Sequence, residues 1–426
     1  MRARFLLLAV ALAAFGGSLF AGFHLDDYAI FSSLALPGLR DPAGYHAVNL
    51  LLHLGAILLA YECLRRLLPG AVALIAAAIF AIHPLQAEAV NSVAARGAML
   101  ASLLCFAALL AWLEGWPWLA VVAFAAALLA DPQCAMFPVA LVLLRPKDRS
   151  MSQRLAALAM VGLAIAAAIS APKGPYALAL VSLRFLRLFA LPWGFTIAPE
   201  VHESLWIAIA TAIAIAAAAV WMWRRQSAPP EPTWLVAGLL LLIPSFARNP
   251  AQDPRAYLAM FAFSAMAGLL IARVPGRGLA IAIVALLIAV SASRTYVWMS
   301  DERLWREAVR QAPGQVAPKI ALAKYLKAAD AIELLGRAKA EAPYNPEISS
   351  AIGKILLDEG QYEGALDELS SAVALDPRNA LAFNNRGVAL AALGQTPAAT
   401  ADFEHALLLA PDLAEARENL KRLSDR

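Results

Sequence analysis

Runs of Ala, Leu, Ile and Val that are long enough to cross a lipid bilayer dominate residues 1–298. A helix needs about 20 residues to cross the hydrocarbon core, where only internally bonded backbones are stable. Of all residues 61% are hydrophobic and 15% are charged, which excludes an ordinary soluble enzyme. Residues 299–426 instead have the composition of a water-soluble domain. The sequence therefore predicts an all-α protein, with a polytopic membrane domain at 1–298 and a soluble domain at 299–426.

The apolar runs predict eleven crossings of the membrane. They lie near residues 5–22, 46–66, 71–83, 97–113, 117–130, 134–144, 155–171, 203–223, 233–246, 256–272 and 279–294. One further apolar segment, 177–192, carries Arg184 and Arg187 one helical turn apart. A cation at mid-bilayer costs at least about 2.5–3.5 kcal/mol, so this segment is predicted to be interfacial or re-entrant.

Basic residues set the predicted orientation, because cytoplasmic loops are enriched in Lys and Arg. With the N-terminus inside, the crossings place the basic groups at 2–4, 65–66, 145–149, 224–225 and 273–277 in the cytoplasm. The soluble domain and the acid-bearing loops then lie outside. A cleaved signal peptide is the alternative for the first segment, because M-R-A-R followed by an apolar core fits that description.

The soluble region contains an internal repeat of 34 residues, marked by Pro343, Pro377 and Pro411. Within that period Gly353 aligns with Gly387, as do other small and apolar positions. This is the tetratricopeptide (TPR) pattern, in which small residues allow two helices to cross closely and Pro ends the second helix.

Three further segments extend this array. Residues 316–345 form a unit shortened by four residues, 301–313 resemble the second helix of a partial repeat, and 413–424 form a polar cap. Such arrays expose a concave groove, so binding of a peptide or protein is predicted. A rigid spacer is the alternative.

Charge and cysteine patterns exclude several other classes. The net charge of +4 is small and the arginines lie mostly in short loops, which argues against a nucleic-acid partner. Cys63, Cys105 and Cys134 have spacings that fit no metal or redox motif, so they are predicted to be small core residues.

Two adjacent acids, Asp26 and Asp27, follow the first apolar segment in the stretch H-L-D-D-Y-A-I, which begins at His24. Burial and a neighbouring anion both raise the pKa of a carboxyl group, so one of the pair is suited to accept a proton near neutral pH. Coupled acids titrate as a pair, so the sequence does not say which one accepts it. A solvated loop or a helix cap is the alternative.

Other charged residues share the same predicted side of the membrane. Glu88 supplies a third carboxylate, while Arg184, Arg187, Arg255 and Tyr257 supply cations and a donor suited to phosphate oxygens. This set fits a reaction in which a deprotonated hydroxyl attacks a sugar carbon whose leaving group is a lipid phosphate. Each residue also has a structural explanation: interfacial anchoring for the two arginines of 177–192, a helix-start acid for Glu88 and a loop charge for Arg255.

Five stretches resemble those of a known family. They are H-L-D-D-Y-A-I, G-Y-H-A-V-N-L-L-L-H-L (44–54), H-P-L-Q-A-E-A-V-N-S-V-A-A-R-G (83–97), R-F-L-R-L-F-A-L-P-W-G (184–194) and D-P-R-A-Y-L (253–258). Along its whole length the chain resembles the membrane proteins with a C-terminal TPR array that act as protein O-mannosyltransferases. These belong to the glycosyltransferase C (GT-C) superfamily, which uses polyprenyl- or dolichyl-phosphate sugars.

The resemblance implies a role for each candidate residue. Asp26 or Asp27 would be the catalytic base, and Glu88 would orient the acceptor or share the proton. The donor phosphate would be bound by Arg184, Arg187, Arg255 and Tyr257. The remaining motif residues, His24, His83 and Arg96, would line the acceptor and donor pocket.

Three positions depart from the family pattern. Gly97-Ala98-Met99 lacks the acid that usually follows Arg96 by two residues, Asp131-Pro132 replaces a Lys-Glu pair, and 253–260 lacks a second aromatic residue. The transferred sugar therefore need not be mannose. The Ala-rich composition indicates a bacterium, in which the lipid would be undecaprenyl phosphate, the membrane the inner membrane and the outer side the periplasm.

The sequence thus predicts an inverting transfer of one sugar from a polyprenyl-phosphate donor to a hydroxyl of an exported protein that the TPR groove presents. The motifs require no metal or other cofactor, although a divalent ion between the acids and a phosphate is an alternative. Two other functions stay open: an inactive membrane-anchored TPR scaffold, and a ligase of lipid-linked glycans.

Overall fold

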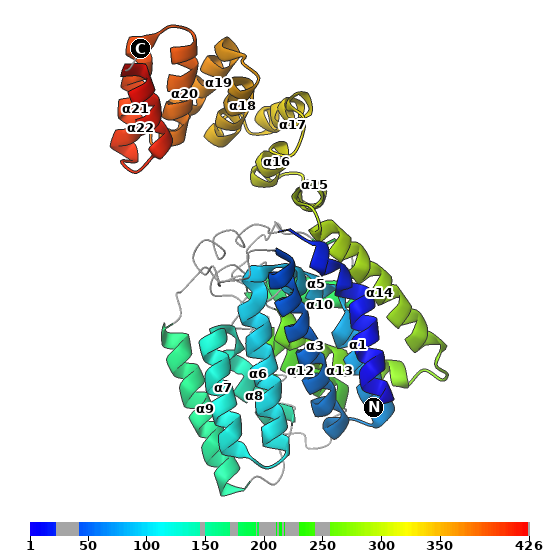
Figure 1. Cartoon of the computed structure of the whole chain (residues 1–426). Coiled ribbons are helices and arrows are strands. Elements are labelled where there is room, and N and C mark those ends of the chain that lie inside the picture. The colour runs from blue at the N-terminus through cyan, green and yellow to red at the C-terminus, as the bar shows by residue number, and fades with distance from the viewer. Residues whose placement is uncertain are drawn as a thin grey trace. The chain divides into compact units, whose positions relative to one another are not determined.

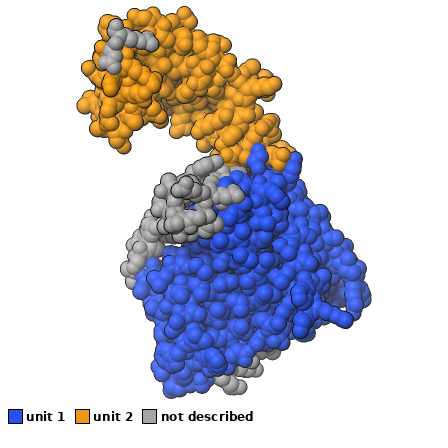
Figure 2. All heavy atoms as spheres, viewed as in Figure 1, with its two compact units in different colours: residues 1–300 blue, residues 301–426 orange. Residues whose placement is uncertain are grey.

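The computed structural model describes residues 1–22, 42–144, 150–170, 178–192, 194–195, 210, 213–214, 217, 230–242 and 256–424. Two compact units divide the chain, Met1–Ser300 and Asp301–Arg426 (Figure 2). The division falls next to the boundary after residue 298 that composition predicts. Within the described ranges every regular element is a helix, which confirms the prediction of an all-α fold.

Unit 1 is a bundle of apolar helices (Figure 1). Its elements are α1 (Arg2–Phe15), η1 (Gly16–Phe20), α3 (Pro42–Leu67), α4 (Gly70–Ile82), η2 (Pro84–Gln86), α5 (Ala87–Asn91), η3 (Val93–Ala95), α6 (Arg96–Leu113), α7 (Pro117–Ala130), η4 (Pro132–Met136), α8 (Phe137–Leu144), α9 (Met151–Ser170), α10 (Leu178–Ala190), α12 (Pro230–Leu242), α13 (Tyr257–Ala272) and α14 (Gly278–Trp298).

Among the described residues, four helices are long and apolar enough to cross a membrane: Arg2–Phe20, Pro42–Leu67, Val93–Leu113 and Gly278–Trp298. A fifth crossing results if α4 and the segment Pro84–Asn91, bent by 45°, form one broken span. Five shorter apolar helical segments of 10–17 residues are Pro117–Ala130, Pro132–Leu143, Met151–Ala167, Glu231–Leu242 and Tyr257–Ala272. Most of the predicted span 203–223 lies outside the described ranges. The helices are those of a membrane protein, and the count of eleven crossings stays a prediction.

Small side chains let the helices of unit 1 approach one another closely. Ala73, Ala76 and Ala77 of α4 are fully buried. On α13, a Cβ added to Gly268 would lie 3.0 Å from the Cβ of Ala76 and 3.1 Å from the carbonyl oxygen of Val72. Membrane helices associate through such close packing, because lipid tails are as apolar as the side chains themselves. The Ala-rich composition therefore serves helix packing.

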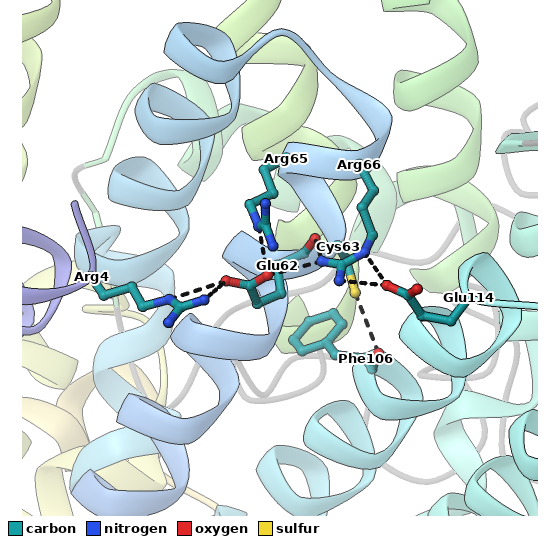
Figure 3. Close-up of polar contacts among 7 residues, drawn as sticks. All are labelled: Arg4, Glu62, Cys63, Arg65, Arg66, Phe106 and Glu114. Carbon is teal, nitrogen blue, oxygen red and sulfur yellow. Dashed lines mark hydrogen bonds and ion pairs between the residues drawn. The ribbon is translucent and has the colours of Figure 1, made fainter. Parts of the chain in front are cut away.

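A cluster of charges joins three segments of unit 1 (Figure 3). Glu62 of α3 accepts hydrogen bonds from Arg4 of α1, from Arg65 and from Arg66, whose Nη1 lies 2.9 Å from its carboxylate. Arg66 also donates to Glu114, which follows α6, at 2.6 Å. The cluster therefore ties the start of α1 and the end of α6 to the end of α3.

Unit 2 consists of antiparallel helix pairs. Its helices are α15 (Asp301–Gln311), α16 (Val316–Ala323), α17 (Ala328–Glu341), α18 (Pro346–Asp358), α19 (Tyr362–Leu375), α20 (Ala380–Ala392), α21 (Thr396–Leu409) and α22 (Ala414–Ser424). The four residues missing from the repeat at 316–345 are reflected in α16, which has 8 residues where α18 and α20 have 13.

The repeated glycines lie where the two helices of a pair cross. A Cβ added to Gly353 would lie 2.5 Å from Cγ of Leu369, and one added to Gly387 would lie 2.7 Å from Cε1 of Phe403. Both distances are shorter than real Cβ contacts, so any larger residue would have to displace the side chain of Leu369 or Phe403. The close crossing is the physical reason that glycine recurs at equivalent positions of successive repeats, as expected for the TPR fold.

Candidate functional site

Residues 83–95 connect α4 to α6 and are called here the α4–α6 corner. The residue before a proline is pushed out of the α region, and His83, which precedes Pro84, has an extended backbone with ψ of 136°. Three short helical turns follow, η2, α5 and η3, and residues 81–91 are all buried. Protein therefore covers the irregular backbone of this broken helix, which would be unstable if lipid surrounded it.

His83 fixes this corner to α10. Its Nδ1 accepts a hydrogen bond from the backbone N–H of Leu85 at 3.2 Å. The proton is therefore on Nε2, which donates to the carbonyl oxygen of Phe189 at 3.0 Å. The ring of Phe189 stacks on the imidazole with 5.1 Å between the centroids. Both ring nitrogens are thus engaged by backbone groups, and His83 positions α10 against the corner.

Glu88 lies in the middle of the corner, in the first turn of α5, and its exposed fraction is only 9%. The predicted phosphate-binding cations come from α10. Arg184 is half-buried, with its guanidinium 5.5 Å from the ring centroid of Phe185, and Arg187 is exposed. Because His83 holds α10 on the corner, the structure brings the helix of the two arginines beside the segment that carries Glu88.

One face of α3 carries three buried polar residues, His46, Asn49 and His53, called here the α3 polar face. Their spacing of three and four residues places them on the same side of the helix. Nε2 of His46 donates to the carbonyl oxygen of Gly22 at 2.9 Å. Nδ2 of Asn49 donates to the carbonyl oxygen of Ser92 at 2.7 Å.

Arg96, at the start of α6, joins this face from the other side of the corner. Its Nε donates to Oδ1 of Asn49 at 3.0 Å, and its Nη2 donates to the carbonyl oxygen of Tyr45 at 3.2 Å. The guanidinium also lies 5.3 Å from the ring centroid of Tyr45. Arg96 and Asn49 together hold the end of the corner against α3.

His53 binds the predicted phosphate ligand Tyr257. Its Nε2 lies 2.9 Å from the carbonyl oxygen of Ala81, so this nitrogen carries the proton. The other nitrogen, Nδ1, then accepts from the hydroxyl of Tyr257 at 2.6 Å. Tyr257 is 1% exposed, and its hydroxyl is engaged inside the bundle. Its role as a phosphate ligand stays a prediction.

Four predicted site residues, His24, Asp26, Asp27 and Arg255, lie outside the described residues. The described chain stops before the two acids at Gly22 and resumes after Arg255 at Ala256. The α3 polar face therefore bonds to three segments: Gly22 just before the acids, Ser92 in the corner that contains Glu88, and Tyr257 just after Arg255.

The sequence predicted no role for His46, Asn49 and His53, although all three lie in the stretch 44–54 that resembles the family. Their helical spacing was the signal that could have identified them. No role was predicted for Arg294 of α14 either, which is 6% exposed and lies with its guanidinium 5.1 Å from the ring centroid of Phe195.

Two of the departures from the family pattern lie side by side. A Cβ added to Gly97 would lie 3.0 Å from the carbonyl oxygen of Ala130 and 4.0 Å from the Cβ of Asp131. Asp131 accepts from the backbone N–H of Gln133 at 2.9 Å and so caps η4. The close approach of α6 to the end of α7 therefore favours glycine at this position.

No group of three or more His, Cys, Asp or Glu that could hold a metal ion occurs within the described ranges.

Comparisons with known proteins identify the repeats and one partial relative. The family described as TPR repeat matches residues 353–394, which confirms the predicted repeats in an all-helical membrane protein. Over 80 residues, 18% of this chain, the sequence is 45% identical to the protein O-mannosyl-transferase Tmtc1 of Drosophila melanogaster. The matched stretch spans 9% of the length of that relative.

Solved structures give weaker similarity. The second TPR domain of human RPAP3, in complex with an HSP70 peptide, is 29% identical with a TM-score of 0.26, covering 28% of this chain and 98% of that domain. Yeast Tom70 is 15% identical with a TM-score of 0.27, covering 83% of this chain and 84% of that chain.

Proposed function

We propose that this protein is a membrane glycosyltransferase of the GT-C type, which moves one sugar from a polyprenyl-phosphate donor to a hydroxyl of an exported protein. The observation that carries the proposal is the α3 polar face, which holds three separate segments of the chain. These are the segments that adjoin or contain the predicted base, the second acid Glu88 and the phosphate-binding Arg255.

In the proposed reaction, the acceptor hydroxyl oxygen attacks the anomeric carbon of the sugar, and its proton passes to the carboxylate of Asp26 or Asp27. The bond from that carbon to the phosphate oxygen breaks, and the lipid phosphate leaves with the electron pair. Attack from the face opposite the phosphate inverts the anomeric configuration. Arg184, Arg187 and Arg255 stabilise the charge on the leaving phosphate.

The remaining residues position the reactants. Glu88 orients the acceptor hydroxyl or shares its proton. His24, His83 and Arg96 line the pocket for the acceptor and donor. His83 and Arg96 also hold the α4–α6 corner in place through their bonds to Phe189 and Asn49. Tyr257 either donates to the donor phosphate or, through its bond to His53, positions the chain next to Arg255.

The similarity to Tmtc1 supports the class of reaction, and the TPR repeats support a protein acceptor. We place the N-terminus in the cytoplasm, the active site and the TPR unit in the periplasm, and the bundle in the inner membrane. A phosphatase fused after Arg426, active only in the periplasm, tests this orientation. Activity of the fusion is expected, and an inactive but intact fusion would contradict it.

Intact-mass analysis of exported proteins tests the activity. Cells with the wild-type chain should add one pentose or hexose to an acceptor protein, and the double variant Asp26→Asn/Asp27→Asn should not. Glu333→Gln, an exposed acid of the TPR unit, is the matched control and should retain the added mass.

The same measurement separates the alternatives. If the double variant keeps the modification while deletion of 316–426 abolishes it, the chain is a scaffold and the transferase proposal fails. An increment of several sugars would instead assign the chain to the ligases of lipid-linked glycans.

A further inference from the structure

Arg294 is a buried cation on a helix whose other residues are largely apolar. It lies in α14, where the sequence reads S-A-S-R-T-Y, and its exposed fraction is 6%. A guanidinium at membrane depth is costly, and such residues face a bundle interior or a polar pathway. An interfacial anchor near a helix end would extend to the surface. The burial of Arg294 excludes that explanation.

Two neighbours of Arg294 fix the direction of this face of α14. Oγ of Ser291 donates to the carbonyl oxygen of Ile82, the residue before His83, at 2.5 Å. Oγ1 of Thr295 donates to the carbonyl oxygen of Ala14 at 3.2 Å. Residues three and four apart share one face of a helix. Arg294 therefore lies on the side of α14 that packs against the α4–α6 corner and α1.

The guanidinium itself contacts the chain that leaves α10. It lies 5.1 Å from the ring centroid of Phe195, five residues after the end of that helix. The corner is thus flanked by α10, which carries Arg184 and Arg187, and by α14, which carries Arg294. Two helices distant in sequence, which together carry three arginines, thus contact the start of the segment that holds Glu88.

We infer that Arg294 binds the phosphate of the lipid-linked donor, an inference that rests on the proposed function. A guanidinium can donate two parallel hydrogen bonds to a phosphate, and burial strengthens that interaction. When the bond between the sugar carbon and the phosphate oxygen breaks, the phosphate keeps the electron pair, and the fixed positive charge stabilises it. Arg294 supplies this charge from inside the bundle, while Arg187 lies exposed.

The test measures binding and does not depend on transfer. Full-length protein in phosphatidylcholine nanodiscs is titrated with undecaprenyl phosphate and, separately, with undecaprenol, and thermal stabilisation gives the two affinities. The wild type should bind the phosphate at least tenfold more tightly than the alcohol. Arg294→Gln should lose this difference. Arg277→Gln removes the same charge from the exposed start of α14 and should retain it.

Two further arms identify the source of the phosphate. Inorganic phosphate at the same concentration, and nanodiscs containing phosphatidylglycerol, should neither stabilise the protein nor compete with undecaprenyl phosphate. Competition by either would assign Arg294 to general anion or phospholipid binding and overturn the inference.

Arg294→Lys decides the outcome if Arg294→Gln does not fold. Lysine keeps the charge but loses the paired donors, so the phosphate lipid should bind at least fivefold more weakly at an unchanged melting temperature. Unchanged binding, or loss of the fold in both variants, would make Arg294 a structural partner of groups in the chain and overturn the inference. Wild-type protein that binds through Arg294 but transfers no sugar would refute the transferase proposal alone.

Discussion

The hydroxyl of Tyr257 donates a 2.6 Å hydrogen bond to Nδ1 of His53, across 204 residues of sequence. The second nitrogen of His53 donates to the carbonyl oxygen of Ala81, so a single imidazole joins α3, α4 and α13. The T-shaped contact of the two rings, with 5.7 Å between centroids, adds to this junction. The start of α13, and with it the position that follows Arg255, is therefore set by α3.

Removing the hydroxyl of Tyr257 should weaken this junction. Tyr257→Phe leaves Nδ1 of His53 buried without its donor, at a cost of about 0.6–1.7 kcal/mol for a hydrogen bond between membrane helices. Thermal unfolding in detergent measures the cost, and His53→Phe/Tyr257→Phe should cost less than the sum of its single variants. A Tyr257→Phe protein of unchanged stability that no longer binds undecaprenyl phosphate would instead establish Tyr257 as a phosphate ligand.

Arg96 and Asn49 should be energetically coupled. Nε of Arg96 donates to Oδ1 of Asn49 at 3.0 Å, and each side chain also donates to a different backbone carbonyl. A double-mutant cycle with Arg96→Lys and Asn49→Ala therefore isolates the bond between the two side chains. We expect a coupling of about 1.5–3 kcal/mol, because hydrogen bonds to charged groups exceed neutral ones. Additive effects of the two substitutions would show that the contact contributes no stability.

The charge cluster of Figure 3 should depend more on Glu62 than on Glu114. Glu62→Gln leaves three arginines without their shared carboxylate and should cost about 1–3 kcal/mol. The Glu114 side chain is 49% exposed, so Glu114→Gln should cost below about 1 kcal/mol. Melting temperatures at low and high salt check both values, and the loss for Glu62→Gln should shrink in salt. Equal losses would contradict the central position of Glu62.

In the TPR unit, Gly387→Ala and Gly336→Ala should have opposite effects. The added methyl of the first meets Phe403 at 2.7 Å and should destabilise by about 1–3 kcal/mol. The second adds a methyl inside α17 with nothing within 4 Å and should stabilise by about 0.5–1 kcal/mol. Circular dichroism of the fragment 301–426 during heating measures both. A neutral Gly387→Ala would show that α20 and α21 can separate freely.

Asp402 and Arg386 form a paired ionic contact in the same unit, with two nitrogen–oxygen distances of 2.7 Å. The hydrogen bonds to Asp402 raise the pKa of the Arg386 guanidinium, so the arginine stays charged at every pH at which the protein is folded. Asp402→Asn should cost about 1–3 kcal/mol, because a half-buried cation loses its carboxylate. Since a raised pKa gives stability that is lost only above it, the Arg386 contribution should not change between about pH 7 and 10. Chemical denaturation of the fragment at both values checks this.

The TPR unit could be predicted from sequence because its packing repeats every 34 residues, so Gly353 and Gly387 mark equivalent helix crossings. The crossing predicted at 71–83 ends next to the end of α4 at Ile82, where proline restricts the residue before it. The partners of the α3 polar face could not be predicted in the same way. The contact between His53 and Tyr257 depends on how α13 packs against α3, and no local pattern contains that information.

Arg294 was missed for a related reason. A single arginine near the end of an apolar run normally extends to the lipid headgroups, and only the packing of Ser291 and Thr295 shows that this one turns inward. The family acid expected two residues after Arg96 is missing at Ala98, and the neighbouring Gly97 makes a close approach that the sequence also concealed. A Cβ at residue 97 would lie only 3.0 Å from the carbonyl oxygen of Ala130.

The α3 polar face also has a consequence for biosynthesis. Helix α3 leaves the ribosome long before α13 exists, so His53 enters the membrane about 200 residues ahead of its partner. Its imidazole, like the amide of Asn49, must be hydrated or otherwise partnered during that interval, because an unsatisfied polar group in hydrocarbon is costly. The hydroxyl of Tyr257 becomes the partner of His53 once α13 has been synthesised and packed against α3. Completion of the bundle is therefore coupled to translation of its penultimate described membrane helix.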